Sequence, residues 1–315
     1  MVHLDPPLVS VILSVYNGDE FLRDAIVSIL NQTLDNFEFI IINDGSTDNT
    51  TQTLKTISDT RIVLIERENK GLSESLNEAI SVAKAKYIAR MDADDIALAN
   101  RLELQYNFME ANPHVGILGG QAITIDKRGI NTGEALKPIG FDRVQQYIKY
   151  ACPVMHPTYF VRKSVYDLTG GYRLLPIEDY DFLFRAFESG VIIDNLPDFL
   201  IKYRFIAEGL TLANPQKTMA LTRVIQKMHA KRTMRGSGSE ESLMLFAKTY
   251  DGTTGWWFRK VYAVRDWAKK YLLSYRKKGS KAGVWLMSCT VISISLLHYQ
   301  LFINSYATYK ASKLV

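Results

Sequence analysis

The sequence contains few cysteines and lacks the two glycine-rich motifs that most often hold nucleotides. Its 315 residues include two cysteines, Cys152 and Cys289, which lie far apart without C-x-x-C spacing. This spacing argues against a disulfide framework and a structural zinc site, and it suits a reducing compartment. The first predicted strand-to-helix turn lacks G-x-G-x-x-G, and G-x-x-x-x-G-K-[ST] occurs nowhere. Dinucleotide cofactors and P-loop nucleotides are therefore disfavoured.

The start of the chain also lacks the features of a signal peptide. The apolar run "LVSVILSVY" follows "MVHLDPP", which has no basic residue cluster and carries an aspartate. No small-residue cleavage site follows cleanly. We therefore predict that the apolar run is the first buried strand.

Positive charge is concentrated at the C-terminal end of the chain. The net charge is +5, yet residues 256–315 contain eleven Lys/Arg and one acid, a balance of +10, which leaves −5 for the rest. Such asymmetry predicts a tail that meets an anionic surface, either a membrane or a nucleic acid.

The tail has two parts of different character. Residues 256–278 alternate aromatic or aliphatic side chains with basic ones, a pattern typical of a helix lying in a membrane interface. This interleaving favours a membrane over nucleic acid. Residues 284–303 carry no Asp, Glu, Lys or Arg and are long enough to span a bilayer core or to form a buried helix in an oligomer. If the segment inserts, the excess of Lys/Arg before it places the main domain in the cytoplasm.

The first part of the chain alternates between strand and helix patterns. Short β-branched or aromatic runs alternate with segments of helical periodicity, which predicts a parallel sheet covered on both faces. The fold class is therefore α/β, with a doubly wound, mostly parallel sheet flanked by helices. The predicted strands are 8–15, 37–42, 61–66 and 86–91, and the predicted helices are 19–32, 48–58, 71–84 and 98–111.

Beyond residue 120 the pattern is less regular. We predict mixed strands and loops over 121–177, a helix opening within 176–190 and a longer helix over 214–233. The run "RGSGSE" (235–240) is a plausible hinge. The predicted organisation is a main domain over 1–234, divided into halves at 8–120 and 121–234, followed by a helical, membrane-associating tail over 235–315.

Polar clusters follow all four predicted strands of the first half. They read "YNGDE", "NDGSTDNT", "RENKG" and "DADD". In parallel sheets ligands bind outside the carboxyl ends of the strands, so these four loops can share one site.

The densest of these clusters contains Asp92, Asp94 and Asp95. Carboxylates at this spacing can present oxygens to Mg²⁺ or Mn²⁺, which prefer one or two carboxylates together with substrate diphosphate oxygens. Acid-rich turns before helices are also common as N-caps, so Asp95 has this simpler explanation as well.

A third acidic group, Glu178, Asp179 and Asp181, stands at the head of the helix predicted within 176–190. Acids at a helix N-terminus interact favourably with the helix dipole. Three of them exceed what a cap needs, and a carboxylate beside a metal-diphosphate site can serve as a general base toward a hydroxyl.

Five motifs in order resemble those of family 2 glycosyltransferases with the GT-A fold. They are "VSVILSVYNGDEFLRDAIVSILNQT", "NDGSTDNT", "NKGLSESLNEAI", "ARMDADD" and "EDYDFLFR", over roughly residues 8–190. The sequence is most similar to the non-processive enzymes of capsule and exopolysaccharide assembly, of the amylovoran and colanic-acid type. The resemblance makes 8–120 the nucleotide-binding half and 121–234 the acceptor half.

The resemblance also implies roles for individual residues. Asp179 matches the catalytic base, with Glu178 and Asp181 as neighbours, and Asp94 matches the direct metal ligand, with Asp92 beside it and Asp95 in support. His156, Gly171 and Tyr172 match the acceptor side, although a lone His before Pro has a structural reading too. The positions matching the nucleotide-sugar site are Val15, Tyr16, Asn17, Asp44, Asn69, Gly71, Asn77, Arg90 and Asp92.

The activity implied by the resemblance is inverting transfer of one sugar from a UDP-hexose. The acceptor is a hydroxyl of a polyprenyl-diphosphate-linked repeat unit at the cytoplasmic face of the inner membrane, with Mn²⁺ or Mg²⁺ as cofactor and no nucleic acid involved. The Q-x-x-R-W element of processive synthases is missing after "EDYD". A sugar nucleotidylyltransferase is disfavoured because such enzymes need a glycine-rich, basic loop after the first strand, whereas "YNGDE" is acidic. The remaining alternative is a non-catalytic scaffold of a polysaccharide-assembly complex.

Overall fold

The computed structural model describes residues 6–175, 177–205, 222 and 225. The chain divides into two compact units, 1–248 and 249–315, and all described residues belong to the first. The predicted boundary near residue 235 stays a prediction. The predicted segments 235–240, 256–278 and 284–303 lie outside the described residues, as does 214–233 apart from residues 222 and 225.

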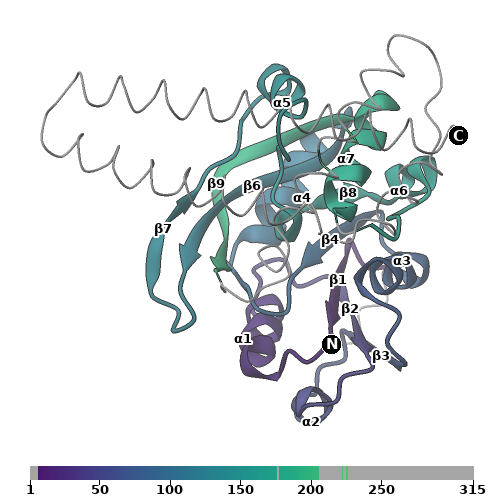
Figure 1. Ribbon diagram of the computed structural model, residues 1–315, viewed down its shortest axis with the longest axis vertical. Coiled ribbons are helices and arrows are strands. Elements are labelled where there is room, and N and C mark those ends of the chain that lie inside the picture. Colours follow the sequence, from purple (N-terminus) through teal and green to yellow (C-terminus); the bar gives the residue numbers. More distant parts are fainter. Residues whose placement is uncertain (1–5, 176, 206–221, 223–224, 226–315) are drawn as a thin grey trace, which may run out of the picture. The chain divides into compact units, whose positions relative to one another are not determined.

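The described part is built on one mixed sheet of nine strands (Figure 1). Its order is β3-β2-β1-β4-β8-β6-β9-β5, with β7 paired to β6. The strands are β1 (Val9–Val15), β2 (Phe37–Asp44), β3 (Ile62–Arg67), β4 (Tyr87–Met91), β5 (Ile96–Ala97), β6 (Val115–Ile125), β7 (Asn131–Ala135), β8 (Phe160–Arg162) and β9 (Ile192–Arg204).

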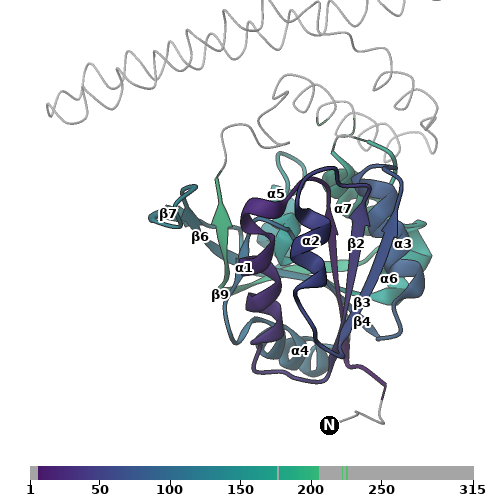
Figure 2. The same cartoon turned by 90° about the horizontal axis from the view of Figure 1, so that it is seen from below.

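The first half of the chain confirms the predicted alternation. β1 to β4 pair in parallel, and each is followed by a helix on one side or the other of the sheet (Figure 2). Their residues are almost entirely buried in β1, β2 and β4, which explains the continuous apolar runs in the sequence. The helices are α1 (Asp19–Leu30), α2 (Thr50–Lys55), α3 (Leu72–Val82) and α4 (Arg101–Ala111).

The second half adds strands of both directions to the same sheet. β8 is antiparallel to β4 and β6, whereas β9 is parallel to β6. β6 runs across residue 120, so the two predicted halves share one continuous sheet. The remaining elements are α5 (Phe141–Tyr147), the 3₁₀ helix η1 (His156–Thr158), α6 (Lys163–Thr169) and α7 (Glu178–Glu188).

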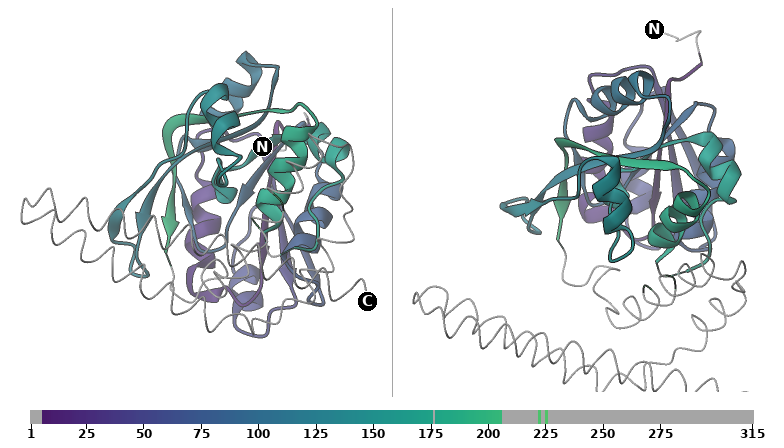
Figure 3. Two further views of the ribbon diagram at one scale, coloured as in Figure 1. Left: turned by 45° about the horizontal axis from the view of Figure 1, so that its top comes forward. Right: turned by 90° about the horizontal axis from the view of Figure 1, so that it is seen from above.

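Two apolar layers hold the helices to the sheet. On one face α1, α2 and α4 pack through side chains such as Ile26, Leu54 and Leu102. On the other face α3, α5, α6 and α7 pack around an aromatic cluster that includes Tyr166, Tyr172 and Phe182. Figure 3 shows this second group of helices from two further sides. Both faces are therefore covered, as the sequence pattern predicts.

Within the part of the chain that the structure describes, no helix is long and apolar enough to cross a membrane.

Candidate active site

The loops after β1 and β2 are tied together by Asn17. This residue has a positive φ of 52°, a conformation that asparagine tolerates better than most residues. Its Oδ1 accepts the N–H of Thr47 at 2.8 Å, and its own N–H donates to Ser46 Oγ at 3.0 Å. Beside it Val15 is buried and Tyr16 is 53% exposed. The Tyr16 ring thus lies open at the predicted nucleotide side of the sheet.

Asp44 organises the loop after β3. Its buried carboxylate accepts the N–H groups of Lys70 and Gly71, both at 2.9 Å, and pairs with Arg67 Nη1 at 2.6 Å. Asn69 lies in the loop that these contacts hold. This bracing role has no local signal in the sequence, because its backbone partners come from a different strand-helix connection. A carboxylate has about four lone-pair sites, so the contacts of Asp44 leave one free for a further hydrogen bond. The predicted contact of Asp44 with a nucleotide base stays a prediction.

The buried Arg90 pairs with the half-buried Asp92 at the end of β4. The guanidinium donates to both carboxylate oxygens of Asp92, with Nη1 to Oδ2 at 2.5 Å. Arg90 itself is buried, and its carbonyl accepts Arg101 Nη2 at 2.7 Å. A two-pronged Arg–carboxylate pair of this kind is strong and directional. Asp92 is therefore held in place before any ligand arrives.

Asp94 and Asp95 follow in the same turn. One Asp95 oxygen accepts the N–H of Arg204 at 2.8 Å, and the other is buried without a hydrogen-bond partner. Among the described residues no other residue's side chain donates to the Asp94 carboxylate. Burial and the neighbouring Asp92 raise the pKa of Asp94 to about 6, and burial raises the pKa of Asp95 well above its usual range. Three carboxylates are thus crowded here with incomplete compensation.

The crowding fits a divalent cation. Oxygens of Asp92, Asp94 and Asp95 lie within 4.8 Å of one another. Oxygen-only donor sets suit Mg²⁺ or Mn²⁺, and the partnerless Asp95 oxygen is an unsatisfied acceptor in the same cluster. Asp94 is the least engaged of the three and is the best candidate for a direct ligand.

Arg204 locks this acidic turn to the end of β9. Its Nε donates to the Asp94 carbonyl at 2.8 Å, and its Nη1 donates to the carbonyls of Asp126 and Lys127, both at 3.1 Å. The short antiparallel pairing of β5 with β9 adds a second link. Sequence reasoning missed Arg204, because more than a hundred residues separate it from the turn that it holds.

Glu178 and Asp179 begin α7 inside the domain. The helix has Ile177 as its N-cap and no side-chain capping hydrogen bond, so these acids are not explained as caps. Glu178 Oε1 lies 3.6 Å from His156 Nδ1, and His156 Nε2 lies 3.0 Å from Tyr172 Oη. Burial and the charge of Arg90 lower the pKa of His156 well below its usual range, so the ring is neutral.

Arg90 links the two acidic groups electrostatically. Burial raises the pKa values of both Glu178 and Asp179, while the positive charge of Arg90 opposes that rise in each. The same guanidinium holds Asp92. The structure therefore brings the predicted metal-binding and base residues into one electrostatic cluster around a buried cation.

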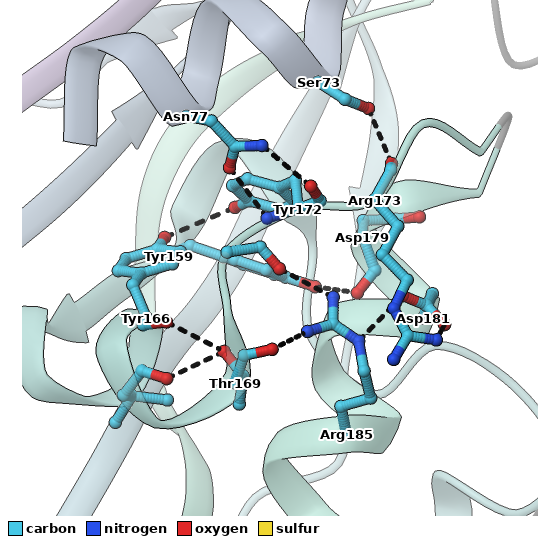
Figure 4. A network of polar contacts seen from close by, with 12 residues as sticks. Ser73, Asn77, Tyr159, Tyr166, Thr169, Tyr172, Arg173, Asp179, Asp181 and Arg185 are labelled. Carbon is cyan, nitrogen blue, oxygen red and sulfur yellow. Dashed lines mark hydrogen bonds and ion pairs between the residues drawn. The ribbon is translucent and has the colours of Figure 1, made fainter. Parts of the chain in front are cut away.

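Asp181 has a different environment from its two neighbours. Its carboxylate accepts Arg185 Nε at 2.9 Å and lies 3.6 Å from Arg173 Nη1. Arg185 in turn donates to the carbonyls of Thr169 and Gly171. Figure 4 shows how this network joins α7 to the loop after α6. Asp181 thus braces the predicted acceptor loop.

Asn77 holds the same loop from α3 (Figure 4). Its amide nitrogen donates to the Tyr172 carbonyl and its Oδ1 accepts the Tyr172 N–H, both at 2.8 Å. Gly171 has φ +72°, and a Cβ at that position would lie 2.6 Å from Asn77 Oδ1. Asn77, predicted to flank the nucleotide, therefore contacts Gly171 and Tyr172 of the predicted acceptor side.

We expect Asn77→Ala to lower the free energy of unfolding by roughly 1–3 kcal/mol, because the part-buried Tyr172 N–H and carbonyl both lose their partner. Chemical denaturation of the full chain measures the change. Ser81→Ala on the same helix is the control, since that hydroxyl bonds only the Glu78 carbonyl at the surface. Equal effects of the two substitutions would contradict the clamp.

The buried Glu178 predicts a pH dependence of stability. Burial and the Asp179 carboxylate raise its pKa from 4.5 to about 7. Between these values the folded protein keeps a proton that the unfolded chain has lost, so the free energy of unfolding falls as pH rises through this window. Glu178→Gln should therefore be more stable than the wild type above pH 7, by roughly 1–3 kcal/mol.

Melting temperatures of both proteins at pH 5 and pH 8 test this expectation, with the exposed Glu74→Gln as control. The stabilising effect of Glu178→Gln should shrink toward pH 5. An effect that is the same at both pH values would show that Glu178 does not titrate in this window.

Two further residues lie near Asp179, of which Lys137 was not predicted. The Cys152 thiol lies 3.7 Å from Asp179 Oδ2 and 3.1 Å from the Val154 carbonyl, and Lys137 Nζ donates to the Cys152 carbonyl at 2.9 Å. The charge of Lys137 also lowers the pKa of Asp179. A single lysine gives no signal in the sequence until the fold places it near an acid.

The family model described as glycosyl transferase family 2 matches residues 10–169. An uncharacterized glycosyltransferase of Methanocaldococcus jannaschii is 34% identical over 236 residues, covering 72% of this chain and 81% of its own length. The amylovoran biosynthesis glycosyltransferase AmsE of Erwinia amylovora is 32% identical over 202 residues, covering 62% and 75%. The residues that the family model matches include the loops after β1 to β4.

Solved structures share the fold at low identity. The mannosyltransferase PcManGT from Pyrobaculum calidifontis, in complex with GDP-Man and Mn²⁺, has a TM-score of 0.56 at 17% identity and covers 98% of this chain and 85% of its own. S. aureus TarS in complex with UDP-GlcNAc also has a TM-score of 0.56, at 16% identity, covering 93% and 91%. The sheet with its flanking helices is thus of the GT-A type.

Proposed function

Because the chain belongs to glycosyl transferase family 2, we propose that it moves one sugar from a nucleotide-sugar to a hydroxyl acceptor with inversion of configuration. One observation carries the proposal: the acids after β4 and the acids that begin α7 both interact with the buried Arg90, which binds Asp92 directly and whose charge opposes the rise in the pKa values of Glu178 and Asp179. The first group suits a metal-diphosphate and the second suits a base. Donor and acceptor can therefore meet between them.

The donor side is formed by the loops after β1 to β4. Tyr16 offers an exposed ring for a base, and the nearby Asp44 has one lone pair left for an N–H group of that base. We favour a UDP-hexose, in keeping with the UDP-GlcNAc bound by TarS, although PcManGT binds GDP-Man. When bound, Mg²⁺ or Mn²⁺ held by Asp94 and Asp92 would neutralise charge on the diphosphate.

Asp179 is the proposed base. Its carboxylate takes the proton of the acceptor hydroxyl as the hydroxyl oxygen forms a bond to the anomeric carbon. The bond from that carbon to the diphosphate oxygen breaks, and the nucleoside diphosphate leaves with the electron pair. Burial raises the pKa of Asp179, which makes it a stronger base than an exposed aspartate. The Cys152 thiol packs beside this carboxylate, 3.7 Å from Oδ2.

The proposed acceptor is the repeat unit of a bacterial surface polysaccharide carried on a polyprenyl diphosphate. The amylovoran biosynthesis role in the name of AmsE supports this pathway class. The basic, aromatic composition of residues 256–278 supports action at the cytoplasmic face of the inner membrane. The lack of Q-x-x-R-W after "EDYD" supports transfer of a single sugar.

Release of nucleoside diphosphate from a panel of UDP-, GDP- and dTDP-sugars tests the proposal. The full chain, purified in detergent, is incubated with each donor in Mn²⁺ or in EDTA, with and without a polyprenyl-diphosphate-linked sugar. We expect one donor to give metal-dependent release that the lipid-linked acceptor accelerates. No release and no donor binding by calorimetry would overturn the proposal and favour the non-catalytic scaffold.

A further inference from the structure

A run of exposed apolar side chains borders the acceptor side of the site. We refer to residues 136–150, which include α5, as the lip. Leu136 is 64% exposed and Tyr150 is 79% exposed. The large apolar side chains exposed on the lip are Leu136, Ile139, Phe141, Tyr147 and Tyr150. Such a concentration in one short segment is a typical sign of an interaction surface.

The lip is anchored from within. Val144 and Ile148 of the same segment are buried, and the Ile148 carbonyl accepts the hydroxyl of Tyr180 in α7 at 2.6 Å. Gly140 at the start of α5 donates its N–H to Asp194 Oδ1 at 2.7 Å. Figures 1 and 3 show α5 on the outside of the domain next to α7. The helix therefore buries one face and presents aromatic side chains on another.

The lip is basic as well as apolar. It contains Lys137, Arg143 and Lys149, against Asp142 as its one acid. Arg143 and Lys149 are exposed. Basic side chains interleaved with tyrosine, phenylalanine and leucine suit the headgroup region of an anionic bilayer, where the rings lie at the polar boundary and the cations meet lipid phosphates. A protein partner of ordinary composition has no such need for these two exposed cations, Arg143 and Lys149.

The lip also leads directly to the proposed base. Lys137 Nζ binds the Cys152 carbonyl at 2.9 Å, and the Cys152 thiol lies 3.7 Å from Asp179 Oδ2. Two contacts therefore connect the exposed lip to the carboxylate of the proposed base. A sugar held close to a lipid surface could reach Asp179 from this side.

We propose that the lip docks on an anionic lipid membrane, so that the mouth of the acceptor site faces the bilayer. This inference rests on the proposed function, since it identifies where the lipid-linked acceptor enters. It does not depend on the C-terminal tail: a tail alone would hold the chain near the membrane in any orientation, whereas the lip specifies one.

Site-specific fluorescence on the full chain tests the orientation. In a background of Cys152→Ser and Cys289→Ser, an environment-sensitive fluorophore is attached at Leu136→Cys or Tyr147→Cys. The matched control is Leu168→Cys on α6, where the native side chain is 60% exposed. Vesicles of equal parts phosphatidylglycerol and phosphatidylcholine should shift the emission of both lip labels to shorter wavelength and leave the control label unchanged. Pure phosphatidylcholine vesicles should give a smaller shift.

Three outcomes would overturn the inference. The chain could cosediment with vesicles while the lip labels stay in water, the control label could shift equally, or the lip labels could shift on raising the protein concentration without lipid, which would identify a second copy as the occupant. Donor hydrolysis without acceptor, measured on Leu136→Ser with otherwise native sequence, is expected to match the wild type. This readout separates a failure of the lip from a failure of the proposed transferase activity.

Discussion

Asp179→Asn should reduce sugar transfer by about 10²–10⁴-fold, the usual contribution of a general base. The amide keeps the shape of the carboxylate but cannot accept the acceptor proton. Donor binding should change little, because the proposed donor-side residues lie on or beside β1 to β4 and α3, not on α7. Transfer to the lipid-linked acceptor is measured by release of nucleoside diphosphate, and donor affinity is measured by calorimetry.

The control for this substitution is Asp167→Asn on α6, an exposed aspartate. It removes the same charge and should leave transfer unchanged. If Asp179→Asn retained more than about a tenth of the wild-type rate, a factor well below that of a general base, the base would have to be sought elsewhere. The neighbouring Glu178, with a pKa raised to about 7, would be the next candidate.

Asp94→Asn should abolish metal-dependent activity, with a loss of at least about 10²-fold. A divalent cation contributes several kcal/mol of charge stabilisation at a diphosphate, and each 1.36 kcal/mol is a factor of ten in rate. Among the three clustered acids, Asp94 has the least engaged carboxylate. The other two already have protein partners and cannot take over its role without rearrangement. Mn²⁺ binding in the presence of nucleoside diphosphate, followed by calorimetry, should weaken in parallel.

Asp24→Asn on α1 is the matched control, because Asp24 is an exposed aspartate outside the acidic cluster. Removing the metal from the wild type with EDTA should reproduce the Asp94→Asn defect. Activity that survives EDTA and is lost in Asp94→Asn would contradict a metal role and would point to a direct contact between Asp94 and the sugar.

The first half of the fold could be predicted from the sequence because its signals are local. Buried parallel strands read as continuous apolar runs, and each is followed by a polar loop and a helical period, so β1 to β4 and α1 to α4 were placed within a few residues. One difference concerns Asn43 and Asp44. Both belong to the end of β2, not to the loop, because Asn43 pairs in register with Val15 and Asp44 with Arg67.

The second half could not be predicted in the same way, because its contacts are long-range. β5 and β9 are neighbours in the sheet but lie far apart in the sequence. The side chains that brace the site also meet partners that are distant in the sequence. Arg204 reaches Asp94, and Asn77 holds Tyr172. The acids themselves were visible as clusters, whereas their supports were single residues with no pattern around them.

The pairing of Asp95 with Arg204 has a consequence for how the protein is made. β1 to β4 contact their neighbours early in the chain and can associate as soon as they leave the ribosome. The turn that carries Asp94 and Asp95 reaches its final geometry only after β9 has been synthesised, because Arg204 supplies an N–H to Asp95 and a guanidinium to the Asp94 carbonyl. Loop closure over such a separation is slow compared with local pairing. A nascent chain that ends before β9 would therefore possess the nucleotide-side strands and an unfinished acidic turn, so donor chemistry begins only once the sheet is complete.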